Sequence, residues 1–124
     1  MSTGLPRGSL SMLKGKVVLV LFPFDDLSAG KVRPAVCLTE PIGPNMHIVL
    51  AFITSRIPKD LEATDVVIDT KDPEFQNTGL CVSSTVRLHR LMTVSASIIR
   101  RELGVLSPAM MAKVDDRLRT LFNL

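Results

Sequence analysis

The apolar run over residues 17–24 is the feature that most restricts how this chain can fold. It is the longest apolar stretch in the sequence, and Pro23 interrupts it. A helix that crosses a membrane needs about 20 apolar residues, so this run is too short for one. Its Val and Leu side chains would cover both faces of an extended backbone, which predicts a buried strand over residues 16–22.

Further strands are expected downstream, separated by turns that carry Gly and Pro. We predict them over residues 33–38, 46–53, 65–68 and 80–92, with Val82, Val86, Leu88 and Leu91 pointing inward. Pro34 suits the start of a strand, where no ladder donor is missed. The alternation of apolar side chains breaks within residues 80–92, and the break indicates a bulge or a bend.

The C-terminal part is expected to contain helices. Residues 95–101 suggest a short helix, and residues 103–106 suggest one more short strand. Ser107 and Pro108 form a typical helix start, with a Ser N-cap and Pro in the first turn. The apolar stripe that follows has helical spacing and consists of Met110, Met111, Val114, Leu118, Leu121 and Phe122. Short strands and a closing helix predict a mainly β protein whose twisted sheet curls into a small barrel.

Length and composition fit one globular domain. The chain has 124 residues, of which 46% are hydrophobic and 22% charged, so it can bury a core. Residues 1–13 are rich in Ser, Gly and Pro and are expected to be a flexible leader or a remnant of cloning. Residues 14–124 would then form the domain. No long apolar segment follows a basic stretch at the N-terminus, so we expect no secretion signal, no membrane association and a cytoplasmic protein.

The charge balance is compatible with a phosphate-bearing partner. The net charge is +3, and a mildly basic chain attracts polyanions without proving that one binds. The sequence has no Trp or Tyr and five Phe, so an aromatic platform for single-stranded bases is not obvious. Cys37 and Cys81 lie in apolar segments and are expected to be reduced and buried. No CxxC or HxxxH spacing occurs, so we expect no metal site and no cofactor.

Three places in the sequence carry side chains suited to chemistry. They are Arg33 at a strand start, Thr54-Ser55-Arg56 after an apolar strand, and Arg87-Leu88-His89-Arg90 within another. Strand alternation would put Arg87 and His89 on one face and Arg90 on the other. Each place also has a plain structural explanation, namely a surface charge for Arg33, a turn cap for Thr54 and a half-buried, hydrogen-bonded His89.

Taken together, the three places suggest cleavage of RNA through its own 2′-hydroxyl. That reaction needs a proton acceptor, a proton donor and a positive group on the phosphorane, and it needs no metal. The guanidinium of Arg33 would bind the developing charge in bidentate fashion. Thr54 and Ser55 would hold a phosphate oxygen or orient the 2′-hydroxyl. His89 is the side chain suited to exchange a proton near neutral pH.

The sequence resembles the MazF/PemK-type growth-inhibitor toxins over residues 14–124. The most specific part is GKVVLVLFPF at residues 15–24, followed after a Gly-containing loop by KVRPAVCL at residues 31–38. AFITS at residues 51–55 is similar to the family's third strand, which ends in Thr or Thr-Ser. TVRLHRLMTV at residues 85–94 is similar to its late strand.

The resemblance implies an SH3-like barrel of the CcdB/PemK type, with a short helix and a C-terminal α-helix, usually in a homodimer. Such proteins are toxins of type II toxin–antitoxin systems. They are sequence-selective endoribonucleases that cut single-stranded mRNA without a metal, leaving a 2′,3′-cyclic phosphate and a 5′-hydroxyl. A cognate antitoxin wraps the dimer and blocks the RNA groove. The pair often represses its own promoter, so operator DNA would be bound only through the antitoxin complex.

The resemblance also assigns roles to individual residues. Arg33 and Thr54 match the family's catalytic arginine and threonine, and Arg87 matches an arginine that is catalytic in the PemK-like branch. His89 stands where that branch often carries Asp, which leaves open whether His89, or Thr54 with Arg33, performs the proton transfer. The loop over residues 25–31 would set base preference. RNA contacts are expected from Ser28, Lys31, Ser55, Arg56 and Arg90.

Two other functions fit parts of the pattern. The same fold without catalysis would act as an antitoxin-binding corepressor or an inactive homologue, but such a copy would be free to lose Arg33 and Thr54. A gyrase inhibitor of the CcdB type would share the barrel. Such toxins depend on a C-terminal helical tip, however, and the Arg-Pro and Thr-Ser pattern is not theirs. We therefore expect a toxin that cleaves RNA.

Overall fold

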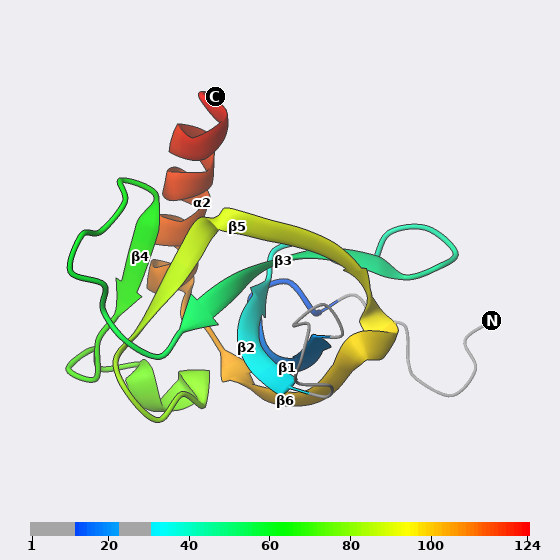
Figure 1. Cartoon of the computed structure of the whole chain (residues 1–124), viewed down its shortest axis with the longest axis horizontal. Coiled ribbons are helices and arrows are strands. Elements are labelled where there is room, and N and C mark those ends of the chain that lie inside the picture. The colour runs from blue at the N-terminus through cyan, green and yellow to red at the C-terminus, as the bar shows by residue number, and fades with distance from the viewer. Residues whose placement is uncertain (1–11, 23–30) are drawn as a thin grey trace.

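Six antiparallel strands form one curved sheet in the computed structural model, which describes residues 12–22 and 31–124 (Figure 1). They are β1 (Lys16–Phe22), β2 (Lys31–Cys37), β3 (His47–Thr54), β4 (Asp65–Ile68), β5 (Ser84–Ser95) and β6 (Ile99–Val105). Their order in the sheet is β4-β5-β3-β2-β1-β6. The sheet curls, but β4 and β6 are its two edges among the described strands, so the barrel is not closed. A mainly β fold with a C-terminal helix is confirmed.

The inner strands bury side chains on both faces, which explains their dense apolar sequence. On β1, Val17 belongs to one cluster of buried side chains, and Val18 and Val20 belong to another. On β2, Val36 belongs to the first cluster and Ala35 to the second. The first cluster extends to the helix α2 (Pro108–Phe122), and the second includes no residue of that helix.

The C-terminal helix begins where its sequence predicts. The Ser107 hydroxyl accepts a hydrogen bond of 3.1 Å from the Met110 N–H, and Pro108 stands in the first turn. Met110 and Val114 are buried, and α2 packs against β4 and β5. Phe122, the last residue of the predicted stripe, is exposed. The helix thus covers the half of the sheet that contains β4.

The expected bulge in the last long strand is present. Ala51 of β3 pairs with Leu91, whereas the next residue, Phe52, pairs with Arg87. Residues 88–90 of β5 therefore have no partner on β3, and the strand bends there (Figure 1). The bend separates the part of β5 that also pairs with β4 from the part that continues over the curl of the sheet.

Two local predictions are wrong. Residues 95–101 are not a short helix, because β5 runs to Ser95, a single 3-10 turn (η2, Ala96–Ile98) follows, and β6 begins at once. Pairing of β6 with β1 draws this segment into the sheet and overrides its local preference. Cys81 and Val82 are exposed and not buried, because they lie in the turn before β5.

The chain packs onto the sheet from Leu13 onward. Leu13 is buried, and its N–H donates a hydrogen bond of 2.9 Å to the Glu40 carboxylate. Apart from Met12 and Leu13, the leader expected over residues 1–13 lies outside the described residues. Within the described ranges, no helix is long and apolar enough to cross a membrane.

Candidate functional site

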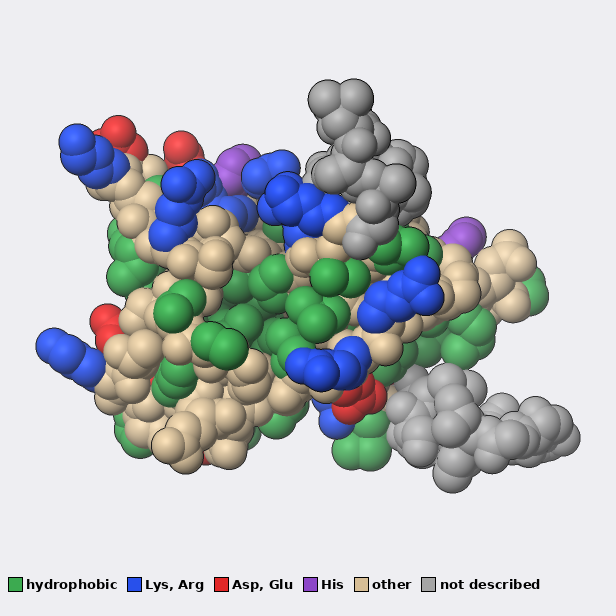
Figure 2. Space-filling model, turned by 60° about the horizontal axis from the view of Figure 1, so that its bottom comes forward, with side chains coloured by type: hydrophobic (Ala, Val, Ile, Leu, Met, Phe, Trp, Pro, Cys, Tyr) green, Lys and Arg blue, Asp and Glu red, His purple; other side chains and the backbone are tan. Residues whose placement is uncertain are grey.

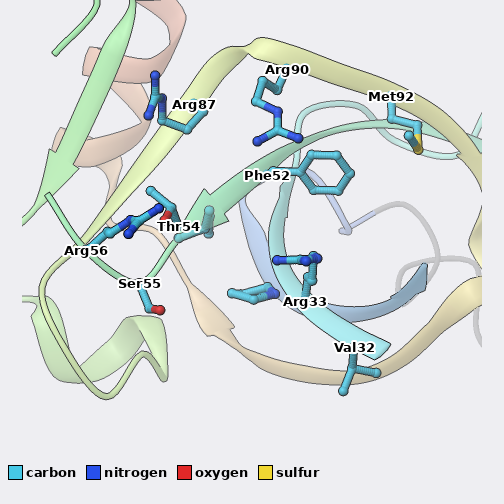
Figure 3. Close-up of a pocket in the computed structure, with 11 residues that line it drawn as sticks. Val32, Arg33, Phe52, Thr54, Ser55, Arg56, Arg87, Arg90 and Met92 are labelled. Carbon is cyan, nitrogen blue, oxygen red and sulfur yellow. The ribbon is translucent and has the colours of Figure 1, made fainter. Parts of the chain in front are cut away.

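A cavity of about 530 Å³ opens where β2, β3 and β5 come together (Figure 3). Its lining consists of Val32, Arg33, Pro34, Phe52, Ile53, Thr54, Ser55, Arg56, Arg87, Arg90 and Met92. A second hollow of about 460 Å³ shares Thr54, Arg56, Arg87 and Arg90 with the cavity and adds Ile57, Pro58 and Lys59. The two hollows therefore adjoin at the end of β3.

Strand β2 delivers Arg33 to the cavity. Arg33 pairs with Val20 of β1, and the next residue, Pro34, also lines the cavity. Arg33 is exposed, and its side chain extends from the strand toward Phe52 in Figure 3. Because a proline holds the residue before it in extended geometry, the Arg-Pro sequence restricts the direction in which the Arg33 side chain leaves the strand.

The end of β3 brings three predicted residues to the same place. Thr54 is the last residue of the strand and pairs with Thr85 of β5. Thr85 is fully buried, and its hydroxyl donates a hydrogen bond of 2.9 Å to the carbonyl oxygen of Arg56. This bond holds the turn after β3 against β5. In Figure 3 the hydroxyl of Ser55 points away from the arginines of β5.

Arg87 is paired with a buried carboxylate. Its Nε lies 3.0 Å from Oδ1 of Asp65, the residue opposite it on β4. The Asp65 side chain is 1% exposed, and its Oδ2 accepts a hydrogen bond of 2.8 Å from the Glu62 N–H. Nε and Oδ1 are close but not aligned as a hydrogen bond, so the contact is an ion pair. His89 approaches the same oxygen, with Nδ1 3.9 Å away.

Arg90 lies over an aromatic ring at the other end of the cavity. Its guanidinium carbon is 5.7 Å from the centre of the Phe52 ring, within range of a cation–π contact. Met92, two residues further along β5, lines the same cavity. Phe52 and Met92 lie together in Figure 3, on the far side of Arg90 from Thr54 and Arg56. The cavity therefore offers an apolar surface beside a cationic one.

Positive charge dominates the two hollows. Their cationic residues are Arg33, Arg56, Lys59, Arg87 and Arg90, and no acidic side chain of the described residues lines either hollow. Figure 2 shows Lys and Arg side chains gathered beside a His on the upper part of the face it presents. Arginine binds phosphate and carboxylate oxygens in bidentate fashion. The site is therefore suited to an anionic ligand with several oxygens.

Most of the predicted site residues meet in this cavity, namely Arg33, Thr54, Ser55, Arg56, Arg87 and Arg90. Lys31 and His89 line neither hollow, and Ser28 lies outside the described residues. Arg87 and His89 both approach Oδ1 of Asp65, in agreement with their predicted common face, but the prediction that Arg90 lies on the opposite face is wrong. The bulge over residues 88–90 brings Arg90 to the same cavity as Arg87 and leaves His89 beside Asp65.

Asp65, Phe52 and Met92 were not among the site residues expected from the sequence. Asp65 opens a short apolar strand, and its partner on β5 becomes evident only when the pairing of the two strands is known. Phe52 and Met92 resemble ordinary core residues. Alternation along β3 puts Phe52 on the same face as Thr54, and this was the one signal in the sequence that pointed to Phe52.

Metal ligands are not gathered in the part of the chain that the structure describes. No group of three or more His, Cys, Asp and Glu side chains there is placed to hold a metal ion. Cys37 and Cys81 are free thiols, the first buried as predicted and the second exposed.

A match to a family model shows to which protein family this chain belongs. A family model described as PemK-like, MazF-like toxin of type II toxin–antitoxin system matches residues 13–122. The protein belongs to this toxin family. The resemblance found in the sequence is thereby confirmed. No curated protein sequence matches this toxin.

Solved structures of MazF toxins share the fold of this toxin. The Mycobacterium tuberculosis toxin MazF-mt6 has a TM-score of 0.67 at 22% identity, with 88% of this chain and 97% of that chain covered. A MazE–MazF structure from Deinococcus radiodurans has a TM-score of 0.69 at 17% identity, covering 92% and 98%. An endoribonuclease in complex with its cognate antitoxin, from a mycobacterial species, has a TM-score of 0.66 at 21% identity, covering 90% and 95%.

Proposed function

We propose that this toxin is a sequence-selective endoribonuclease that cuts single-stranded mRNA without a metal ion. The observation that carries the proposal is the meeting of Arg33, Thr54 and Arg87, from three different strands, at one cavity. Two of the similar solved structures are themselves described as endoribonucleases. The chemistry of the cavity supports the same activity for this chain.

The two parts of the cavity suit the two parts of a nucleotide. The cationic part near Thr54, Arg56 and Arg87 matches a phosphate group, and the apolar part at Phe52 matches a flat base. An RNA base reaches such a ring only when it is unstacked from its neighbours, which favours single strands over duplexes. Arg90 extends the stacking surface through its planar guanidinium.

The reaction is an internal transesterification. The ribose 2′-oxygen attacks phosphorus, and the bond from phosphorus to the 5′-oxygen breaks, which leaves a 2′,3′-cyclic phosphate and a 5′-hydroxyl. The 2′-hydroxyl loses one proton and the leaving oxygen gains one. Negative charge grows on the non-bridging oxygens, where Arg33 and Arg87 stabilise it and Thr54 donates a hydrogen bond.

His89 is the proposed proton carrier, because an imidazole exchanges protons near neutral pH. It lines neither hollow, so this role requires the bound RNA to extend past Arg90 toward β4. Further RNA contacts are assigned to Ser28, Lys31, Ser55, Arg56 and Arg90. In this scheme the charge stabilisation comes from arginines, and the nucleophile comes from the substrate itself.

The proposed partners follow from the family. A cognate antitoxin would cover the cationic cavity, and two of the similar structures hold a toxin with its antitoxin. We assign the toxin to a homodimer in the cytoplasm, with operator DNA bound only through the antitoxin complex. An acidic antitoxin segment fits the excess of arginine at the site.

The activity is tested by incubating the purified toxin with a long single-stranded RNA in EDTA and mapping the ends. We expect cuts at a limited set of sequences, with cyclic phosphate on one side and a 5′-hydroxyl on the other. Arg33→Ala should abolish cleavage. Arg100→Ala removes an exposed charge from β6, away from the cavity lining, and should cut like the wild type. If several RNAs stay intact, the toxin is a non-catalytic antitoxin-binding corepressor instead.

A further inference from the structure

Asp65 is the one charged side chain that is buried among the described residues. A carboxylate inside a protein raises the free energy of the fold unless charges and hydrogen bonds compensate it. The Glu62 N–H compensates one oxygen, at 2.8 Å from Oδ2. The other oxygen, Oδ1, faces the cationic side chain of Arg87.

The contact with Arg87 joins the buried carboxylate to the cavity. Asp65 and Arg87 are cross-strand partners on β4 and β5, so the backbone pairing sets their separation. Oδ1 lies 3.0 Å from Nε, while Arg87 lines both hollows. A guanidinium is planar and rigid. A carboxylate beside Nε therefore favours some orientations of the two terminal amino groups over others.

We propose that Asp65 is a positioning residue, which holds the guanidinium of Arg87 in the orientation that binds the scissile phosphate. The proposal rests on the proposed endoribonuclease function. Asp65 lines neither hollow and acts through Arg87, whose Nε is nearer to Oδ1, at 3.0 Å, than the Nδ1 of His89, at 3.9 Å. The Arg87 side chain is 21% exposed, so its free movement is already limited, and the ion pair selects one orientation within that space.

Asp65 also stabilises the turn before β4, and the experiment must separate this contribution from the positioning role. Its Oδ2 and its backbone N–H, which donates to the Glu62 carbonyl at 3.0 Å, close the turn before β4. Asp65→Asn keeps the shape and one acceptor oxygen but removes the charge that orients Arg87. Asp116→Asn is the matched control, since it breaks an exposed Asp–Arg pair, with Arg117 at 3.1 Å on α2.

The decisive experiment is a double-mutant cycle on RNA cleavage with Asp65→Asn, Arg87→Ala and both together. We expect Asp65→Asn to lower kcat by about ten- to a hundredfold, by analogy with the loss found when a residue that orients a metal ligand is removed, with KM nearly unchanged. In the Arg87→Ala background the same substitution should change kcat little. A purely structural role predicts instead that the two losses multiply, and that result would overturn the proposal. Asp116→Asn should leave kcat and KM at wild-type values.

A second measurement does not depend on cleavage. The Nε–H resonance of Arg87 in NMR spectra should exchange slowly with solvent in the wild type and rapidly in Asp65→Asn. If the wild type cuts no RNA but this change is seen, the proposed function fails while Asp65 still orients Arg87. If the wild type cuts and exchange is equally fast in both proteins, the positioning role fails. If Asp65→Asn does not fold, Asp65→Glu replaces it in both experiments. This variant keeps the charge but displaces it, and the expected outcomes are the same.

Discussion

The hydroxyl of Thr85 on β5 donates a hydrogen bond of 2.9 Å to the carbonyl of Arg56, two residues past the end of β3. This bond joins a fully buried side chain to the turn that carries part of the cationic site. The turn is therefore held by β5, the same strand that supplies Arg87 and Arg90.

Replacing Thr85 by Val, which has nearly the same shape, should loosen this turn. We expect the free energy of unfolding to fall by about 1 kcal/mol, the usual net value of one hydrogen bond, and cleavage to slow several-fold as Thr54 and Arg56 lose their fixed places. Urea unfolding and initial cleavage rates measure the two effects. Thr93→Val changes an exposed threonine of the same strand and should alter neither. Equal behaviour of the two variants would show that the bond does not support the site.

Arg33→Lys separates charge from geometry at the proposed phosphate clamp. Lysine keeps the positive charge but cannot bind two phosphate oxygens in parallel. We expect kcat to fall on the order of 100-fold, as when one group that stabilises the transition state is lost, while binding of a non-cleavable RNA analogue changes little. A lysine variant with wild-type kcat would mean that Arg33 acts only as a point charge.

Phe52→Leu tests the apolar part of the cavity. The substitution keeps a partly buried hydrophobic side chain on β3 but removes the ring that lies under the Arg90 guanidinium and on which a base would stack. Stacking on an aromatic ring contributes about 1–3 kcal/mol per base, so a non-cleavable RNA oligonucleotide should bind about tenfold more weakly. Fluorescence titration gives the affinity. The control is Phe122→Leu, at an exposed position on α2, which should bind the oligonucleotide like the wild type. Identical affinities for all three proteins would exclude base stacking on Phe52.

Much of the fold follows from local signals in the sequence. Ser107 and Pro108 marked the start of α2, because capping is decided by a few neighbouring residues. The dense apolar strand at residues 16–22 was predictable, since burial on both faces leaves no polar alternation. The segment at residues 95–101 was not predictable, because pairing with β1, far away in the chain, decides its conformation.

Thr54 lies at the end of β3 as expected, where local turn chemistry ends the strand. Arg33 lines the cavity, but it is not at a strand start, because pairing with β1 extends β2 back to Lys31. Arg90 does not lie on the face expected for it, because a register shift of three residues on β5 interrupts simple alternation. The ion pair of Asp65 with Arg87 could not be predicted, because it depends on β4 and β5 being neighbours in the sheet.

His89→Gln tests the proposed proton carrier. Glutamine keeps a polar side chain near Asp65 but cannot exchange a proton at neutral pH. We expect kcat to drop on the order of 100-fold, within the range of general acid–base catalysis, with RNA affinity retained. His47→Gln, at the exposed start of β3, should leave kcat unchanged. If the two variants are equally active, proton transfer belongs to another group, such as Thr54 assisted by Arg33.

Cys37 should make the stability of the toxin depend on pH in the alkaline range. Burial raises the pKa of the Cys37 thiol from 9.0 to about 12, and the carboxylates of Glu102 and Glu40 add to the rise. Above pH 9 the unfolded chain therefore releases a proton that the native state still holds, so rising pH favours unfolding, whereas below pH 9 the effect vanishes. The free energy of unfolding should fall by about 1.4 kcal/mol per pH unit through this group between pH 9 and 12. Urea unfolding at several pH values gives the slope of the unfolding free energy against pH, which should be shallower for Cys37→Ala. Cys81→Ala changes an exposed thiol and should keep the wild-type slope. Equal slopes in all three proteins would contradict the raised pKa of Cys37.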